Sequence, residues 1–144
     1  MIDLLKEKDL KLSLAESLTG GMIAQRIVNV SGASEVFGYG FVTYSNKAKH
    51  KCLGVKKRTL KEQGAVSAKC AREMAKGACK ASGADISISV TGLAGPGGGT
   101  KETPVGTVLW AAAIRQAIAK EFPLYRKSHA GPRADYSACT GDVT

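Results

Sequence analysis

Three side chains in one short part of the sequence have the chemistry to hydrolyse an amide bond. Ser34 lies in a glycine-containing loop, and Tyr44 closes an apolar run. Lys49 lies one turn into a helix that we expect to begin at residue 46. A serine hydroxyl is a poor nucleophile at neutral pH, so it needs a base, and a neutral lysine amine can be that base. Together they are the parts of a serine–lysine hydrolase.

Lys49 can act as a base only if its pKa falls from the ordinary value of about 10.4. Burial and repulsion from the lysines at positions 47–57 would both lower that pKa, whereas a close carboxylate, Glu16 or Glu35, would raise it. The residue types alone also allow a plainer interpretation. Ser34 could cap a helix, Tyr44 could be a core aromatic residue, and Lys49 could be a solvated charge.

The composition predicts one globular domain with its own core, because the chain has 144 residues and is 44% hydrophobic. No apolar run approaches the roughly 20 residues that cross a bilayer, and the first residues lack the apolar centre of a secretory signal, so we expect a cytoplasmic protein. The cysteines at positions 52, 70, 79 and 139 form no C-x-x-C pair, which disfavours zinc or redox chemistry.

The formal net charge of +9 favours an anionic partner but does not identify one. Many of the cations fall at positions 47–58, with only aliphatic residues between them, so the aromatic platforms of a single-strand binder are missing. A solvated basic face explains the charge equally well.

Hydrophobic periodicity and turn residues predict alternating helices and strands. We expect helices at residues 2–8, from 22, 46–54, 59–63 and 67–82, and strands at 10–15, 37–45, 85–90, 104–113 and 121–125. The strand at 85–90 alternates Ile and Val with Ser87 and Ser89, which predicts one more polar face. From residue 126 no periodicity remains, so we expect an irregular tail.

Two glycine-rich stretches could bind an anion. The first is a strand, a Gly-Gly turn and a helix start, with Thr19 as the expected N-cap, so Thr19 and Gly20 could present free N–H groups to a phosphate. The second, residues 91–100, has the spacing of neither a P-loop nor a dinucleotide-binding G-x-G-x-x-G motif. It could form a nest of N–H groups for an anion, or it could be a flexible connection.

The chain resembles the CinA C-terminal domain family, whose stand-alone members are nicotinamide mononucleotide deamidases. The resemblance covers about residues 14–125. It rests on five motifs in the same order: Ala15-Glu-Ser-Leu-Thr-Gly-Gly, Gly40-Phe-Val-Thr-Tyr-Ser-Asn-Lys-Ala-Lys, Gly64-Ala-Val-Ser, Val90-Thr-Gly-Leu-Ala-Gly-Pro-Gly-Gly-Gly and Lys101-Glu-Thr-Pro-Val-Gly-Thr-Val. It implies a single α/β domain over residues 1–144, a three-layer α/β/α sandwich with a mixed central sheet.

The resemblance also implies hydrolysis of the carboxamide of nicotinamide mononucleotide, with Ser34, Tyr44 and Lys49 as the catalytic set. The implied substrate-binding residues are Thr19, Gly20, Thr91, Gly92, Ala94, Gly95 and Arg133. No metal or cofactor is implied, and we expect a homo-oligomer that acts on an anionic mononucleotide, with no nucleic-acid or membrane partner. This chain departs from the family at Leu18, where Cys is common, and at its end, where only Gly131-Pro-Arg133 echoes the family motif and we expect the family's last helix to be missing or replaced.

Two hypotheses follow from the sequence. The leading one is an amidohydrolase, in which Ser34 attacks the carboxamide, Lys49 transfers the proton and Tyr44 positions or relays it. The rival is a non-catalytic module that binds a nucleotide or nucleic acid in competence or damage responses, and it draws on the charge of +9 and the divergent tail.

Overall fold

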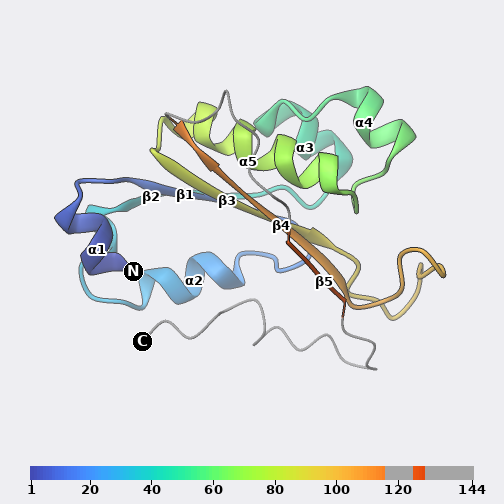
Figure 1. The fold of residues 1–144 in the computed structure, drawn as a ribbon, viewed down its shortest axis with the longest axis horizontal. Coiled ribbons are helices and arrows are strands. Elements are labelled where there is room, and N and C mark those ends of the chain that lie inside the picture. Colours follow the sequence, from blue (N-terminus) through green and yellow to red (C-terminus); the bar gives the residue numbers. More distant parts are fainter. Residues whose placement is uncertain (116–124, 129–144) are drawn as a thin grey trace.

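The structure is a computed structural model that describes residues 1–115 and 125–128 (Figure 1). Its centre is a five-stranded sheet in the order β2-β1-β3-β4-β5. The strands are β1 Leu12–Glu16, β2 Phe37–Val42, β3 Ile86–Gly92, β4 Thr107–Ile114 and β5 Tyr125–Ser128. β1 pairs in parallel with β2 and with β3, whereas β3–β4 and β4–β5 are antiparallel. The sheet is therefore mixed, as the resemblance implied.

Helices cover both faces of the sheet. α1 (Ile2–Glu7) and α2 (Met22–Val28) lie on one face, and α3 (Asn46–Leu53), α4 (Lys57–Glu62) and α5 (Ala68–Ser82) lie on the other (Figure 1). A short 3₁₀ helix, η1 (Ala33–Glu35), leads into β2. These three layers confirm the predicted α/β/α sandwich. None of the helices in the described part of the chain is long and apolar enough to cross a bilayer.

β1 is buried along its whole length, and its side chains alternate between the two helical layers. Leu12 and Leu14 join the core beneath α1 and α2, together with Ile27. Ala15 joins a second core cluster with Met74, beneath α5. Both faces of the strand are therefore covered, which suits the centre of a sheet that is partly parallel.

The face of β3 that carries Ser87 and Ser89 is not a solvent face. Both residues are fully buried, and the Ser89 hydroxyl donates a hydrogen bond of 2.6 Å to the carbonyl of Ala71 in α5. Small polar side chains can lie in an interior when a backbone acceptor is within reach. The serines therefore leave room for α5 to lie close to the sheet.

α5 agrees with the prediction in its extent and its caps. Ser67 accepts a hydrogen bond of 3.2 Å from the amide of Cys70, and Gly83 ends the helix in the left-handed region at φ 70°. The helix also touches α3 at Gly77, where an added Cβ would overlap the carbonyl of Leu53. This contact fixes how closely the two helices pack.

Other boundaries differ from the predictions. α3 is capped by Ser45, whose hydroxyl accepts from the amide of Ala48, so the N-cap precedes Asn46. α2 spans residues 22–28 and its buried residue is Ile27, whereas Val28 is 59% exposed. The predicted irregular tail from residue 126 is wrong for residues 126–128, because they belong to β5, which pairs with β4. The rest of the tail, including Arg133, lies outside the described residues.

Gly77→Ala should destabilise the protein, although alanine is the better helix former by about 1 kcal/mol. The new methyl group would force α3 away from α5, and overpacking of this kind typically costs about 1–3 kcal/mol. Denaturant unfolding would measure the change in the free energy of unfolding. Gly97→Ala is the matched control, since an added Cβ there meets nothing within 4 Å. A Gly77→Ala protein that is more stable than wild type would contradict the proposed contact.

Candidate active site

Buried polar side chains gather where the parallel strands β1, β2 and β3 end. Glu16 and Ser17 stand at the end of β1, Thr43 follows β2, and Thr91 lies near the end of β3. All four are less than 9% exposed. The carboxyl ends of parallel strands meet at one edge of a sheet, which is where open α/β sheets bind ligands. This edge is therefore the candidate active site.

Lys49 brings an amine into this cluster from α3. The residue is only 1% exposed, and its Nζ donates to Ser17 Oγ at 2.8 Å and to the carbonyl oxygen of Thr43 at 2.6 Å. Residues 43–45 join β2 to α3, and Lys49 and Leu53 are the buried residues of that helix, so the Lys49 side chain points inward from its first turn. The result is a buried pair of a hydroxyl and an amine, from residues 32 positions apart.

Burial lowers the pKa of Lys49 from its ordinary value, because the charged ammonium loses its hydration. This confirms the predicted direction, but the cause is desolvation and not the neighbouring lysines. A Cys70 thiolate would raise the pKa of Lys49. However, burial raises the pKa of Cys70 itself to about 11, so at neutral pH this thiol carries no charge.

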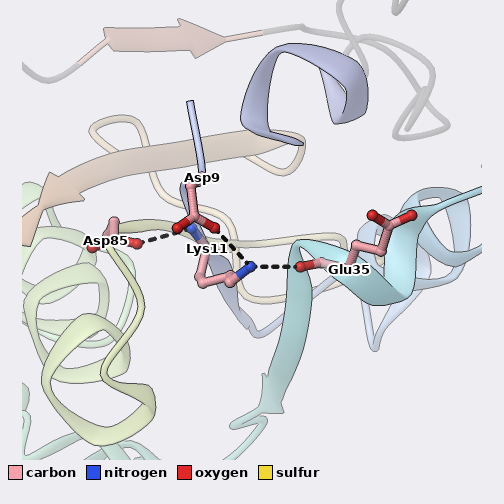
Figure 2. Close-up of polar contacts among 4 residues, drawn as sticks. All are labelled: Asp9, Lys11, Glu35 and Asp85. Atoms are coloured by element: carbon pink, nitrogen blue, oxygen red, sulfur yellow. Dashed lines mark hydrogen bonds and ion pairs between the residues drawn. The ribbon is translucent and has the colours of Figure 1, made fainter. Parts of the chain in front are cut away.

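Ser34 lies at the opposite end of the strands, where β2 begins. It is an exposed residue of η1, just before β2 begins. Figure 2 shows its neighbour Glu35, whose carbonyl oxygen accepts a hydrogen bond of 2.9 Å from Lys11 Nζ. The Lys11 amide in turn donates to the carboxylate of Asp85, which precedes β3 (Figure 2). These contacts place Ser34 at the amino ends of β1, β2 and β3.

The six residues of β2 therefore separate Ser34 from Lys49. At about 3.3 Å per residue, that strand alone spans roughly 17–20 Å. Within one chain the structure does not bring the predicted nucleophile to the predicted base. Tyr44 follows Thr43 but is 75% exposed, so it also stands outside the buried pair. Of the three predicted catalytic residues, only Lys49 belongs to the cluster.

Ser17 is the residue that the sequence prediction missed. A signal was present, because Ser17 directly follows a buried strand and lies within the Ala15-Glu-Ser motif. This motif also predicts a phosphate site, but the position after a central strand is a common place for catalytic side chains as well. Its hydroxyl is the one that the structure places beside Lys49.

The start of α2 is occupied by the carboxylate of Glu16. Its Oε1 accepts from the amide of Ala24 at 2.8 Å, and its Oε2 accepts from the amides of Gly21 and Ile23 at 3.2 and 3.1 Å. The Thr19 hydroxyl also donates to Oε2, at 2.6 Å, so Thr19 is not the N-cap, which is Gly21. A phosphate at Thr19 and Gly20 would meet donors that already bond to other acceptors, and it would lie beside the carboxylate of Glu16. The geometry does not favour that expectation.

The predicted anion loop begins at the same edge, since Val90 accepts a hydrogen bond of 3.0 Å from the amide of Ser17. The hydroxyl of Thr91 donates to the carbonyl of Ala65, and an added Cβ at Gly92 would overlap the carbonyl of Thr107. These two residues therefore serve the fold. Ala94 is half-buried in the loop itself.

Glycine has two different roles in the rest of this loop. Gly95 has φ +85°, and an added Cβ there would overlap Val105, so the turn itself requires glycine. Gly97 has open space around it and an exposed backbone. Gly97 is therefore the position at which a side chain could obstruct a ligand without disturbing the loop. In residues 1–115 and 125–128 no group of three or more His, Cys, Asp or Glu side chains could hold a metal ion.

Comparison with known proteins agrees with this fold and these motifs. The family model of the CinA C-terminal domain matches residues 1–134. A competence-damage inducible protein of Clostridium perfringens is 62% identical over 105 residues, which are 73% of this chain and 26% of that protein. A CinA-like protein of Akkermansia muciniphila is 55% identical over 111 residues, 77% of this chain and 27% of its own length. The chain thus spans about a quarter of the length of these curated relatives.

Solved structures show the same similarity. The competence/damage inducible protein CihA from Agrobacterium tumefaciens superposes with a TM-score of 0.80 at 42% identity, over 88% of this chain and 74% of that one. A CinA superfamily protein from Escherichia coli gives a TM-score of 0.82 at 39% identity, over 90% of this chain and 73% of its own. With the family model, the sequence relatives and the fold in agreement, this chain belongs to the CinA C-terminal domain family.

Proposed function

We propose that this chain is an amidohydrolase in which Ser17 is the nucleophile and Lys49 is the base. The observation that carries the proposal is the 2.8 Å contact between Lys49 Nζ and Ser17 Oγ, in a buried site that lowers the pKa of the lysine. Such chemistry needs a hydroxyl and, within hydrogen-bond reach of it, an amine whose pKa is lowered. The described cluster offers no histidine in that place.

The Thr43 carbonyl helps to orient the amine. A neutral lysine amine has two N–H groups and one lone pair, and a carbonyl oxygen can only accept. The 2.6 Å contact with Thr43 therefore takes an N–H group. Ser17 is the partner that can donate a proton to the lone pair, across the same 2.8 Å distance. The neutral lysine is thereby aimed at the hydroxyl that it must activate.

In the proposed reaction, Ser17 Oγ bonds to the carboxamide carbon while its proton passes to Lys49 Nζ. The carbon–nitrogen bond then breaks, and Lys49 returns the proton to the departing ammonia. A water molecule then attacks the acyl carbon while Lys49 takes one of its protons. The bond between that carbon and Ser17 Oγ breaks, and Lys49 returns the proton to Oγ, with the carboxylic acid as product. Every proton that moves is carried by Lys49, and no oxidant or reductant is consumed.

We propose nicotinamide mononucleotide as the substrate, on the basis of the family resemblance. The net charge of +9 suits an anionic substrate, and the exposed backbone of residues 95–100 follows the strand that is bonded to Ser17. Tyr44 is exposed beside Thr43, where it could contact bound substrate without relaying a proton. Ser34 has no part in the reaction as we propose it.

A second candidate is a non-catalytic nucleic-acid-binding module. It is favoured by the exposed lysines of α3 and α4, Lys47, Lys51 and Lys57, and by the competence-damage names of the relatives. Nucleic-acid binding that weakens steeply with salt, together with no ammonia release from the mononucleotide, would favour this candidate.

Ser17→Ala should lower ammonia release from nicotinamide mononucleotide by at least about 100-fold, because it removes the proposed nucleophile. Ser34→Ala, the matched control at the far edge of the sheet, should leave turnover close to wild type. An ammonia-release assay on both purified variants decides between the two hydroxyls. Normal turnover in Ser17→Ala with lost turnover in Ser34→Ala would reverse the assignment.

Lys49→Arg should be as inactive as Lys49→Ala, because a guanidinium group stays protonated in proteins and cannot act as the base. In the wild type, activity should rise with pH through the lowered pKa of Lys49. The rate measured as a function of pH in wild type and in both variants checks this. Substantial activity of Lys49→Arg at neutral pH would show that the lysine acts only as a charge.

The titration of Lys49 should also make the free energy of unfolding depend on pH. The pKa of Lys49 lies below its ordinary value of 10.5 in the fold, so between these two pKa values the unfolded chain binds the additional proton. Stability therefore rises with pH in that interval. The difference in unfolding free energy between wild type and Lys49→Met should therefore change in favour of wild type as pH rises through that interval. A constant difference for Lys49→Met would contradict a lowered pKa.

Gly97→Val should weaken binding of the mononucleotide more than binding of its unphosphorylated riboside, because the new side chain blocks the open backbone of the loop. Calorimetric titration of both ligands measures the two losses. Gly95→Val is uninformative, since it would overlap Val105 in any case. Equal losses for the two ligands with Gly97→Val would exclude the loop as a phosphate site.

A further inference from the structure

A hollow lies beside α5, and neither Ser17 nor Lys49 is among the residues that line it. Its volume is about 510 Å³, within the usual range for small-molecule sites. It is lined by the end of α3 (Leu53, Gly54), by α5 and by the segment after β4 (Arg115). Ile114 at the end of β4 pairs with Ile86 at the start of β3, so Arg115 lies at the amino ends of the parallel strands, opposite the end that carries Ser17. It is therefore separate from the proposed active site.

Four cationic side chains from three separate segments line this hollow, Lys56, Lys76, Lys80 and Arg115. Within residues 1–115 and 125–128, none of the four forms an ion pair with a carboxylate. The guanidinium of Arg115 is fixed by a hydrogen bond of 3.1 Å to the carbonyl of Gly83. Like charges that share one cavity repel each other, and a bound anion would relieve that repulsion.

The single carboxylate in the lining, Glu73, is already engaged. Its Oε2 accepts from the amide of Lys56 at 2.8 Å, and its Oε1 accepts from the hydroxyl of Thr59 at 2.8 Å. These bonds tie the start of α4 to α5. Glu73 therefore serves the fold and does not pair with the four cations.

The floor of the hollow is apolar and firmly packed. Leu53 and Cys79 are 4% and 1% exposed, and Gly77 lies so close to Leu53 that no side chain fits between them. The Cys79 thiol is held by the carbonyl of Ala84 at 3.0 Å. A site with a rigid apolar floor and a cationic rim suits a ligand that has both a compact body and several negative charges.

We propose that this hollow binds a small molecule that carries a diphosphate group. A diphosphate distributes its charge over several oxygens, so that more than one of the four cations can donate to it. The four cations come from three separate segments and line one hollow of about 510 Å³, which favours a small ligand over the extended backbone of a nucleic acid. This proposal is independent of the amidohydrolase assignment, because it uses neither Ser17 nor Lys49.

The test uses ADP as the probe, with adenosine as the ligand that lacks phosphate. ADP should bind saturably with one site per chain, and its binding should shift the amide NMR signals of Gly54, Gly77 and Gly83 more than those of Gly97 and Gly98. Adenosine should bind at least about tenfold more weakly, since it makes no charge-assisted bonds. Equal affinity for the two ligands, or shifts confined to residues 97 and 98, would overturn the proposal.

Two double variants with the same change in charge separate the hollow from the general basic surface. Lys76→Gln with Lys80→Gln removes two cations from the rim, whereas Lys47→Gln with Lys51→Gln removes two exposed cations of α3 outside it. The rim variant should lose at least about tenfold in ADP affinity, and the α3 variant should lose much less. Equal losses in both, or binding of single-stranded oligonucleotide with none of ADP, would also overturn the proposal. All of these outcomes can be read whether or not the protein releases ammonia.

Discussion

The burial of one amine governs the architecture around the site. An ammonium or amine cannot lie in an interior without acceptors, and Lys49 finds two, the Ser17 hydroxyl at the end of β1 and the Thr43 carbonyl at the end of β2. Both acceptors are available only because β1 and β2 are parallel and end at the same edge. The helix that carries Lys49 must then lie close to the sheet, and its neighbour α5 must lie close to that helix, which the glycine at position 77 permits.

Two buried or half-buried carboxylates have the same structural task. Glu16 accepts the first amides of α2, and Glu73 accepts from the amide of Lys56 and the hydroxyl of Thr59 at the start of α4. In each case a side chain from another element satisfies the donors that a local cap would otherwise satisfy. A carboxylate at such a place also neutralises the positive end of the helix. This arrangement explains why the start of α2 is not the anion site that its sequence suggested.

The sequence predicted most of the elements, because hydrophobic periodicity and capping residues are local, as Ser67 and Gly83 around α5 illustrate. It failed where long-range packing decides the outcome. Ser87 and Ser89 are polar by type, yet α5 buries them, and no local pattern reveals that cover. At the site, the lowered pKa of Lys49 could be anticipated from its chemistry. Its partner could not, because Ser17 reaches it through strand pairing and not through sequence spacing, while Ser34 is close in sequence and lies at the far edge.

The alternation of side chains along β1 has a consequence for how this family can change during evolution. Consecutive residues Glu16 and Ser17 project into opposite helical layers, one to the start of α2 and the next to the amine on α3. Deleting or inserting a single residue upstream in β1 would exchange their directions, placing the carboxylate among the α3 partners and the hydroxyl against unbonded amides. Substitutions in this strand can therefore accumulate one at a time, whereas a change in its length would disrupt both helical layers at once.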